Sequence, residues 1–295
     1  MDDLPQPTAH LRLAPPDGLD EERKTKIANA LHQYRETVKE HNLIAVRMMV
    51  DAMEVRPDPP NWSPSLAKDM RIEPFRRNLG PLPASVALLR DILGEEVRGE
   101  LIRQARLDGL SHENADPHAR AEFFAAVRAR ILEEKVDEAL AEFPPPDLEY
   151  LCTLIGDITG SGLPFHQECS QFAFVSPLRD HPLAYILNVV VPLHSDEDLM
   201  APGNEFDDLW EGWEVAVAFR MGVGIRLWGG SYALFCRSER QGHEQWSWRY
   251  GVHDEEWSSD VYDTVEEFLG SYAHFREETD EDIGRYYIRS LSSLL

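Results

Sequence analysis

The sequence predicts an α+β fold, in which a helical N-terminal half precedes a C-terminal, mainly antiparallel sheet flanked by helices. Two observations support this prediction. Apolar side chains recur at helical spacing before residue 146, whereas six of the seven tryptophans lie beyond residue 200, among stretches rich in β-branched and aromatic residues. The run Pro144–Pro146 separates the two parts. We therefore expect three divisions: a flexible leader (1–19), a helical region (20–146) and an acidic, Trp-rich α+β domain (147–295).

The helical region is expected to begin at Asp20, because Asp20, Glu21 and Glu22 suit the positive N-terminal end of a helix. The proline-rich stretch Arg56–Pro64 interrupts any helix. Apolar side chains at intervals of three and four residues predict helices on both sides of this break. These helices are expected around Ile27–Val38, Leu43–Val55, Pro83–Leu93, Glu95–Leu107 and Pro117–Phe143.

The second half opens with a short amphipathic helix at Asp147–Ile158, and strands are expected where β-branched and aromatic residues gather. Thr264-x-x-Glu267 matches a capping box and predicts the start of a helix whose apolar face runs from Val265 to Phe275. A last helix is expected at Ile283–Leu295. The expected strands are Phe172–Ser176, Ala184–Leu193, Tyr232–Arg237 and Gln245–Val252.

The stretch Val215–Leu227 fits two periods. Every odd position in it is apolar, which is the period of a strand, but Trp210, Trp213, Val217 and Met221 also share one helix face. Because thirteen residues is long for one strand, we expect a helix over 206–221 and then a strand to residue 228. Gly229-Gly230 predicts a tight hairpin after that strand.

The charge of the chain predicts the class of its partner. The formal net charge is −24, and residues 147–295 hold 9 Lys+Arg, all of them Arg, against 27 Asp+Glu, a net charge of −18. Such a field repels nucleic acid and anionic membrane surfaces and attracts a basic protein. We therefore expect a protein partner of basic charge, and neither a nucleic acid nor a membrane.

The location is predicted by elimination. The first residues have no basic region followed by an apolar stretch, and the most apolar run, Leu183–Leu193, is too short to span a bilayer. Three widely spaced cysteines do not suggest a disulfide framework. We expect a cytoplasmic protein, with the nucleus as the alternative.

The candidate partner-binding surface consists of acidic residues in loops. These residues do not form a calcium site of the EF-hand type, because positions 6 and 12 counted from Asp196 are Ala201 and Asp207. The alternative interpretation is a set of ordinary solvated loops. The candidates are Asp196, Glu197, Asp198, Asp207, Asp208, Asp254, Glu255 and Glu256.

One local pattern favours an enzyme instead. His166-Gln167-Glu168 has the H-x-E spacing of zinc deaminases, and Cys169 follows it. The P-C-x-x-C part of that motif cannot be formed from Cys152, Cys169 and Cys236. A metal-dependent hydrolase or deaminase that uses His166, Glu168 and Cys169 is therefore the alternative. The main expectation is that the chain has no catalytic residue, metal or cofactor.

The order of elements over residues 147–276 resembles the SUKH superfamily. The resemblance lies in the Gly-rich turn at 155–162, the sequence Leu227-Trp228-Gly229-Gly230, the Trp-rich strand Trp246–Tyr250 and the helix that opens at Tyr262–Leu269. It implies an α+β fold that binds without catalysis. Bacterial members of the superfamily are immunity proteins that neutralise toxins, and fungal members include a signalling scaffold. Our hypothesis is accordingly a non-enzymatic, acidic protein-binding module, either an immunity protein or a signalling adaptor.

Overall fold

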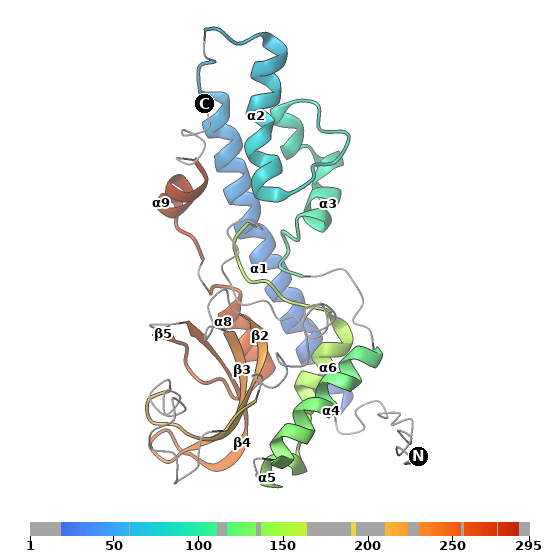
Figure 1. The fold of residues 1–295 in the computed structure, drawn as a ribbon, viewed down its shortest axis with the longest axis vertical. Coiled ribbons are helices and arrows are strands. Elements are labelled where there is room, and N and C mark those ends of the chain that lie inside the picture. Colours follow the sequence, from blue (N-terminus) through green and yellow to red (C-terminus); the bar gives the residue numbers. More distant parts are fainter. Residues whose placement is uncertain are drawn as a thin grey trace, which may run out of the picture.

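Helices come first and an antiparallel sheet follows in the computed structural model, so the predicted α+β class is confirmed. A long first helix runs from the region of the sheet to a group of helices at the opposite end of the molecule (Figure 1). The structure describes residues 19–58, 60–110, 117–133, 137–163, 190–192, 210–223, 230–254, 257–275 and 277–288.

Helix α1 (Glu21–Glu54) joins the two ends. The Asp20 carboxylate accepts a hydrogen bond from the Arg23 backbone N–H at 2.7 Å and caps the helix where the sequence predicted its start. The two predicted segments, Ile27–Val38 and Leu43–Val55, form one continuous helix of 34 residues, about 50 Å long at 1.5 Å per residue. No Pro or Gly lies between them, so nothing ends the first segment.

The helical arm, which we define as residues 45–107, contains α2 (Pro64–Leu79), the 3₁₀ turn η1 (Leu89–Leu93) and α3 (Glu95–Gln104). The predicted break after α1 is confirmed, because α1 ends at Glu54 and α2 begins at Pro64. The helix expected over 83–93 is wrong in its first part. The Asp91 carboxylate accepts the backbone N–H groups of Ala87 and Leu88 and holds Leu88 in an extended conformation, so helical structure starts only at Leu89.

Among the described residues, three further helices follow the arm. They are α4 (Pro117–Glu133), α5 (Asp137–Ala141) and α6 (Pro146–Leu154). Helix α6 packs against α1, and α4 packs against α5. The pattern over 117–143 predicted one helix, and the structure describes two within it. Its predicted apolar face is buried at Phe123, Phe124, Val127 and Ile131.

Within the described residues the sheet has five strands in sequential order, and every neighbouring pair is antiparallel. The strand expected over 245–252 is confirmed as the central part of β4, whereas the strand expected over 172–176 lies outside the described residues. The strands are β1 (Val190–Pro192), β2 (Glu214–Val223), β3 (Gly230–Ser238), β4 (His243–Asp254) and β5 (Trp257–Ser258).

The helix expected over 206–221 is wrong, because its described part from Glu214 onward is strand β2. Two neighbours decide this, since β2 hydrogen-bonds to β1 on one side and to β3 on the other. Both faces of β2 are also buried. Phe219 enters one apolar cluster and Ala218 another, which a helix with one apolar face would not achieve.

The expected strand over 232–237 lies in β3 and forms a hairpin with β2. The tight turn predicted at Gly229-Gly230 is wrong, and the strand expected up to residue 228 is described only to Val223. Val223 pairs with Gly230, so the connection is the six residues 224–229, and Gly230 is the first residue of β3. A Cβ atom at Gly230 would clash with the carbonyl oxygen of Gly222. Gly230 is therefore required for the close approach of two backbones and not for a turn.

Helix α8 (Val265–Tyr272) covers the sheet beside α1. Thr264 caps it as predicted, because its hydroxyl accepts the Glu267 N–H at 3.2 Å. The Glu267 carboxylate accepts the N–H of Asp263 instead of that of Thr264, so the reciprocal half of the box is displaced by one residue. The predicted apolar face of Val265, Phe268, Leu269, Tyr272 and Phe275 is buried.

The C-terminal segment returns along α1 to the helical arm. It contains α9 (Asp280–Ile283) and the π-helical turn η5 (Gly284–Ile288). Ile283 and Tyr287 are buried in the apolar cluster of the arm. Of the last helix expected over 283–295, only the part up to Ile288 lies within the described residues.

In the part of the chain that the structure describes, three apolar clusters hold the fold together. The first lies between one face of the sheet and the helices α1, α4, α5, α6 and α8, and the third lies on the opposite face of the sheet. The second is the core of the helical arm. The first cluster contains side chains from both sides of residues 144–146, while the domain limits given above stay predictions.

Candidate functional site

Most of the predicted site residues lie outside the described part of the chain. This holds for His166, Glu168 and Cys169 of the alternative enzyme site. Asp254 is the last residue of β4 and pairs with Trp257 through its backbone. The other acidic candidates, Asp196, Glu197, Asp198, Asp207, Asp208, Glu255 and Glu256, also lie outside the described residues. These assignments stay predictions.

The two described cysteines are structural. Cys152 on α6 and Cys236 on β3 are both fully buried. Burial raises the pKa of Cys236 to about 12 and the pKa of Cys152 well above its usual value, so both remain protonated thiols at neutral pH. Over the residues that the structure describes, no group of three His, Cys, Asp or Glu side chains is placed to hold a metal ion.

The strand end where β2 starts and β3 turns into β4 carries exposed acidic side chains. We call this region the sheet end; its acidic members are Glu211, Glu214, Glu239 and Glu244. The Ser238 hydroxyl donates to the Gly212 carbonyl at 2.6 Å, which ties the segment before β2 to the β3–β4 turn.

Two of the three described arginines at or beside the sheet end, Arg237 and Arg249, form ion pairs within the fold, and the third, Arg240, is exposed. Arg249 is only 6% exposed; its Nε donates to Asp263 at 2.6 Å and its Nη1 to the Cys236 carbonyl at 2.7 Å. Arg237 donates to Glu214 at 2.8 Å.

By contrast, Glu211, Glu239 and Glu244 make no ion pair with any described residue. Counting Arg237 and the exposed Arg240, the sheet end has a net charge of −2.

Aromatic rings make this surface rigid. Trp213 stacks on His243 with ring centroids 5.3 Å apart. The guanidinium group of Arg249 lies over the Trp213 ring, 5.0 Å from its centroid. Trp246 stacks on Phe235 at 5.7 Å. Because these side chains are already packed, a partner would meet them without a large ordering cost.

The face of β4 that carries Trp248 and Tyr250 is packed under helices. Trp248 Nε1 donates to the Ala139 carbonyl of α5 at 3.3 Å, and Tyr250 packs on Phe268 of α8 with ring centroids 6.2 Å apart. Both rings are buried in the first apolar cluster. They are therefore core residues and do not form a stacking surface for bases.

A buried polar junction connects four elements beneath the sheet. Asp147 of α6 accepts the hydroxyl proton of Tyr250 at 2.6 Å and forms an ion pair with Arg23 of α1 at 3.5 Å. It also accepts the backbone N–H of Val265 at 3.4 Å, at the start of α8. Burial, followed by the adjacent Asp147 carboxylate, raises the pKa of Tyr250 well above its ordinary value. The junction is structural, since its groups satisfy one another.

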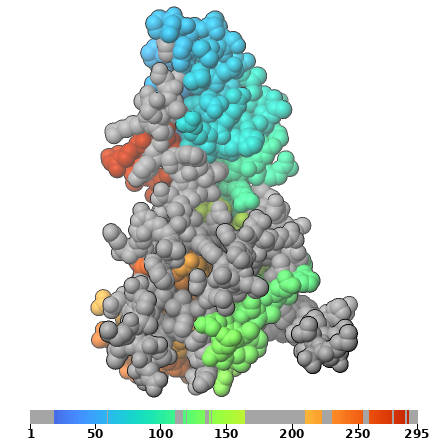
Figure 2. Space-filling model, viewed as in Figure 1, coloured from blue at the N-terminus to red at the C-terminus, as the bar shows by residue number. Residues whose placement is uncertain are grey.

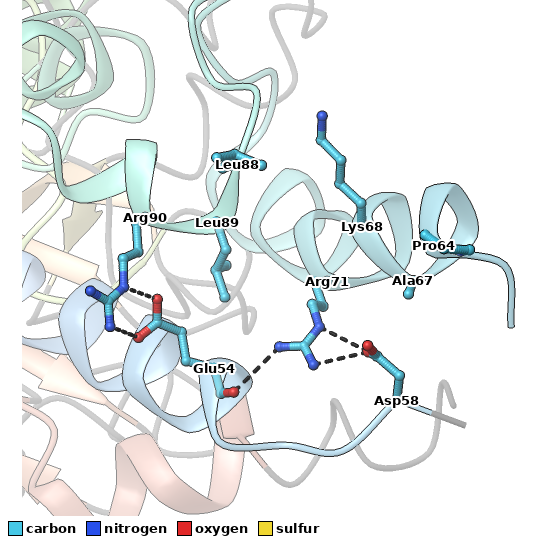
Figure 3. A pocket seen from close by; sticks show the side chains of 9 residues that line it. All are labelled: Glu54, Asp58, Pro64, Ala67, Lys68, Arg71, Leu88, Leu89 and Arg90. Atoms are coloured by element: carbon cyan, nitrogen blue, oxygen red, sulfur yellow. Dashed lines mark hydrogen bonds and ion pairs between the residues drawn. The ribbon is translucent and has the colours of Figure 1, made fainter. Parts of the chain in front are cut away.

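A pocket of about 610 Å³ lies at the tip of the helical arm, between the end of α1, the start of α2 and η1 (Figure 3). Arg71 fixes its floor. Its Nε donates to Asp58 at 2.9 Å, and its Nη1 and Nη2 donate to the carbonyls of Met53 and Arg56, each at 2.7 Å. These carbonyls lie at the C-terminal end of α1, where helix acceptors lack partners within the helix.

The rim of the pocket combines an ion pair, a lysine and apolar side chains. Arg90 and Glu54 form a two-bond pair, with Nη2 to Oε2 at 2.8 Å. Lys68 projects from α2 away from the Arg71 pair, and Leu88 and Leu89 form the opposite wall (Figure 3). The arm forms a prominence at one end of the molecule, and its own residues make up that surface in the space-filling view (Figure 2).

The pocket was not anticipated from the sequence, because α2 was not predicted. A signal for that helix exists. Ser63 precedes Pro64, and the Ser63 hydroxyl accepts the Leu66 N–H at 3.2 Å, which is the arrangement of an N-cap followed by proline in the first turn. Helical spacing in the following residues is weak, and Pro74 lies inside the helix.

Neither a family model, nor a curated protein, nor a solved structure matches this chain. The resemblance to the SUKH superfamily therefore stays a prediction. None of the described helices is long and apolar enough to cross a membrane.

Proposed function

We propose that this chain is a non-enzymatic protein-binding module, an immunity protein or a signalling adaptor, whose acidic C-terminal half binds a basic protein. The observation that carries the proposal is that two arginines beside the sheet end are paired within the fold while three glutamates of the sheet end are exposed. Arg237 and Arg249 are bound to carboxylates and rings of the fold, while Glu211, Glu239 and Glu244 face solvent without ion-pair partners among the described residues.

This arrangement supports recognition of positive charge. Exposed carboxylates on a rigid strand end produce a fixed negative potential, which speeds the encounter with a basic partner and selects against acidic ones. The half-buried Trp246 adds apolar area next to the charge, and the buried Trp213 stacks on His243 within the fold. A tryptophan beside charged groups is a frequent anchor in protein interfaces.

The test begins with affinity capture from the native organism by the full-length protein. Each captured protein is then purified, and its binding is measured directly at two salt concentrations. We expect a basic partner whose affinity falls by about tenfold for Glu239→Lys/Glu244→Lys and also falls as salt rises.

The matched control is Glu36→Lys/Glu40→Lys, which makes the same change in net charge on exposed positions of α1. We expect this control to bind nearly as well as the unmodified protein. Recovery of no protein partner, or equal loss of affinity in the two double variants, would contradict the proposed function.

A further inference from the structure

We propose that the pocket at the tip of the helical arm is a second docking site, which binds an acidic segment carrying a leucine-type side chain from a partner protein. The site is distinct from the sheet end, and the proposal does not depend on the proposed function. Its basis is the combination of a concave site, an exposed apolar wall and cations that the fold does not fully use.

The charge of the arm differs from that of the rest of the chain. Residues 45–107 hold 10 Lys+Arg and 9 Asp+Glu, a net charge of +1, whereas the remaining residues hold 19 and 44, a net charge of −25. The arm lies at the opposite end of α1 from the sheet (Figure 1). Because α1 is about 50 Å long and the Debye length in physiological salt is about 8 Å, salt screens the pocket from the acidic sheet end. The acidic helix α9 packs on the core of the arm, so the relevant charge is that of the pocket lining, where Lys68, Arg71 and Arg90 outnumber Glu54 and Asp58 by one.

The apolar wall of the pocket includes a leucine that is exposed to solvent. Leu88, which lines the pocket, has 56% of its surface exposed. Single exposed apolar residues are common, but an exposed leucine in the wall of a concavity is typical of an interaction site. An aliphatic side chain placed on Leu88 and Leu89 would remove this surface from water.

The cations of the rim are suited to carboxylates. The Lys68 amine makes no ion pair with any described residue, and its side chain, which lines the pocket, points away from the Arg71–Asp58 pair (Figure 3). The side chain of Arg90 is 81% exposed although it is paired with Glu54. An exposed pair of this kind stabilises a fold little, so an incoming carboxylate can share or replace Glu54 at small cost. Arg71 stays in place, because four groups of the end of α1 and its loop hold it.

These features define the occupant. A segment with an aliphatic side chain flanked by Asp or Glu fits the Leu88 wall with its apolar part and reaches Lys68 and Arg90 with its carboxylates. A pocket of about 610 Å³ has the size of a site for a few side chains, since ligand pockets commonly measure about 300–1,000 Å³. A basic segment would instead place its charge against Lys68 and Arg90 and be repelled.

The experiment selects peptides against the full-length protein. A displayed library of random twelve-residue peptides is enriched on the unmodified chain, and the enriched peptides are synthesised for affinity measurement. We expect sequences that combine Asp or Glu with Leu, Ile or Phe. We further expect their affinity to fall by about tenfold for Leu88→Asp and for Lys68→Glu/Arg90→Glu.

Matched controls separate docking from folding. Leu93→Asp changes an exposed leucine of η1 outside the pocket lining, and Arg98→Glu changes an exposed arginine of α3. Both are expected to bind the peptides unchanged, and all variants should melt at the temperature of the unmodified protein. The sheet-end variant Glu239→Lys/Glu244→Lys should also bind the peptides, which keeps this test independent of the proposed function.

Three results would overturn the proposal. The first is a selection that enriches Lys- and Arg-rich peptides or enriches none. The second is an affinity of the enriched peptides for Leu88→Asp that equals their affinity for the unmodified chain. The third is concentration-dependent self-association of the unmodified chain that Leu88→Asp abolishes, as measured by sedimentation. That result would assign the pocket to a second copy of this chain.

Discussion

The helical arm and the sheet end both contain arginines that support the backbone, yet the two regions are left with opposite surface charge. At the sheet end, Arg249 is buried among Asp263, the Cys236 carbonyl and Trp213. In the arm, Arg71 binds main-chain carbonyls and Arg90 lies on the surface.

The comparison shows that the number of charges in a region does not determine what its surface offers. A buried arginine that neutralises a carboxylate leaves the other acids of the region unbalanced. In the arm, Arg71 pairs with Asp58 and Arg90 with Glu54, but both pairs are partly exposed and Lys68 pairs with no described residue, so the pocket lining keeps a net charge of +1. The acidic surface and the basic pocket therefore follow from the partners that the fold gives to each cation.

The largest effect is expected for Arg249→Met. The substitution removes the ion pair with Asp263 and leaves the buried Cys236 carbonyl without its donor, so we expect the free energy of unfolding to fall by about 3 kcal/mol. The matched variant Arg71→Met, in the arm, should cost about 1.5 kcal/mol, because its side chain is partly exposed and water replaces the lost donors. Urea denaturation followed by circular dichroism measures both. A larger loss for Arg71→Met would break the comparison.

The next largest effect is expected at Asp147, which bonds to Arg23 of α1 and to Tyr250 of the sheet. Asp147→Ala leaves the buried hydroxyl of Tyr250 without its acceptor and should lower the free energy of unfolding by about 2 kcal/mol. Asp147→Asn keeps an acceptor at this position and should cost about half as much. Equal losses in the two variants, measured by denaturant unfolding, would assign the effect to the charge of Asp147 and its pairing with Arg23.

A smaller, pH-dependent effect is expected where the C-terminal segment crosses α1. The Glu277 carboxylate contacts the Nδ1 atoms of both His41 and His274, at 3.3 and 2.6 Å. Burial lowers the pKa of His41 from its usual 6.5, and the Glu277 carboxylate partly opposes this decrease. The pKa of Glu277 is lowered as well, mainly by its hydrogen bond with His274 and further by the nearby His41. Burial raises the pKa of Glu278 beside Tyr287, which makes a contribution of opposite sign.

The direction follows from which state binds protons first. Below pH 6.5 the unfolded chain protonates His41 before the folded chain does, so stability falls as the pH decreases from 7 through 6.5. At lower pH, protonation of Glu277 removes further stability, while protonation of Glu278 in the folded state offsets part of the loss. Urea midpoints at several pH values should show this slope, and His41→Gln should reduce it between pH 7 and 6. An unchanged slope in His41→Gln would refute the assignment, and the exposed partner variant His274→Gln serves as control.

The smallest effect is expected for the Glu54–Arg90 pair of the pocket rim. Arg90→Gln should leave the urea midpoint unchanged within error, because an exposed ion pair contributes little to stability. This result would sharpen the contrast with Arg249 and support the availability of Arg90 for a partner. A clear decrease of the midpoint would show that the rim is part of the framework of the arm.

The sequence by itself determined the elements whose residue pattern fits only one type of secondary structure. The apolar spacing of α8 and its Thr264 cap identified that helix, and the aromatic and β-branched residues of 245–252 identified β4. Acidic charge at the start of α1 and the prolines after it located both ends of that helix. In each case the chain neighbours supply the deciding interaction, so local chemistry is sufficient.

Only the tertiary structure decided the elements that depend on distant partners. Residues 214–221 fit a helix and a strand equally well, and pairing with β1 and β3 selected the strand. The joining of two apolar segments into α1 reflects two cores at its two ends. The pocket brings Glu54, Lys68 and Leu88 together from three elements. Hydrogen bonds and burial between residues far apart in the chain are absent from any local pattern, which is why the fold alone set these features.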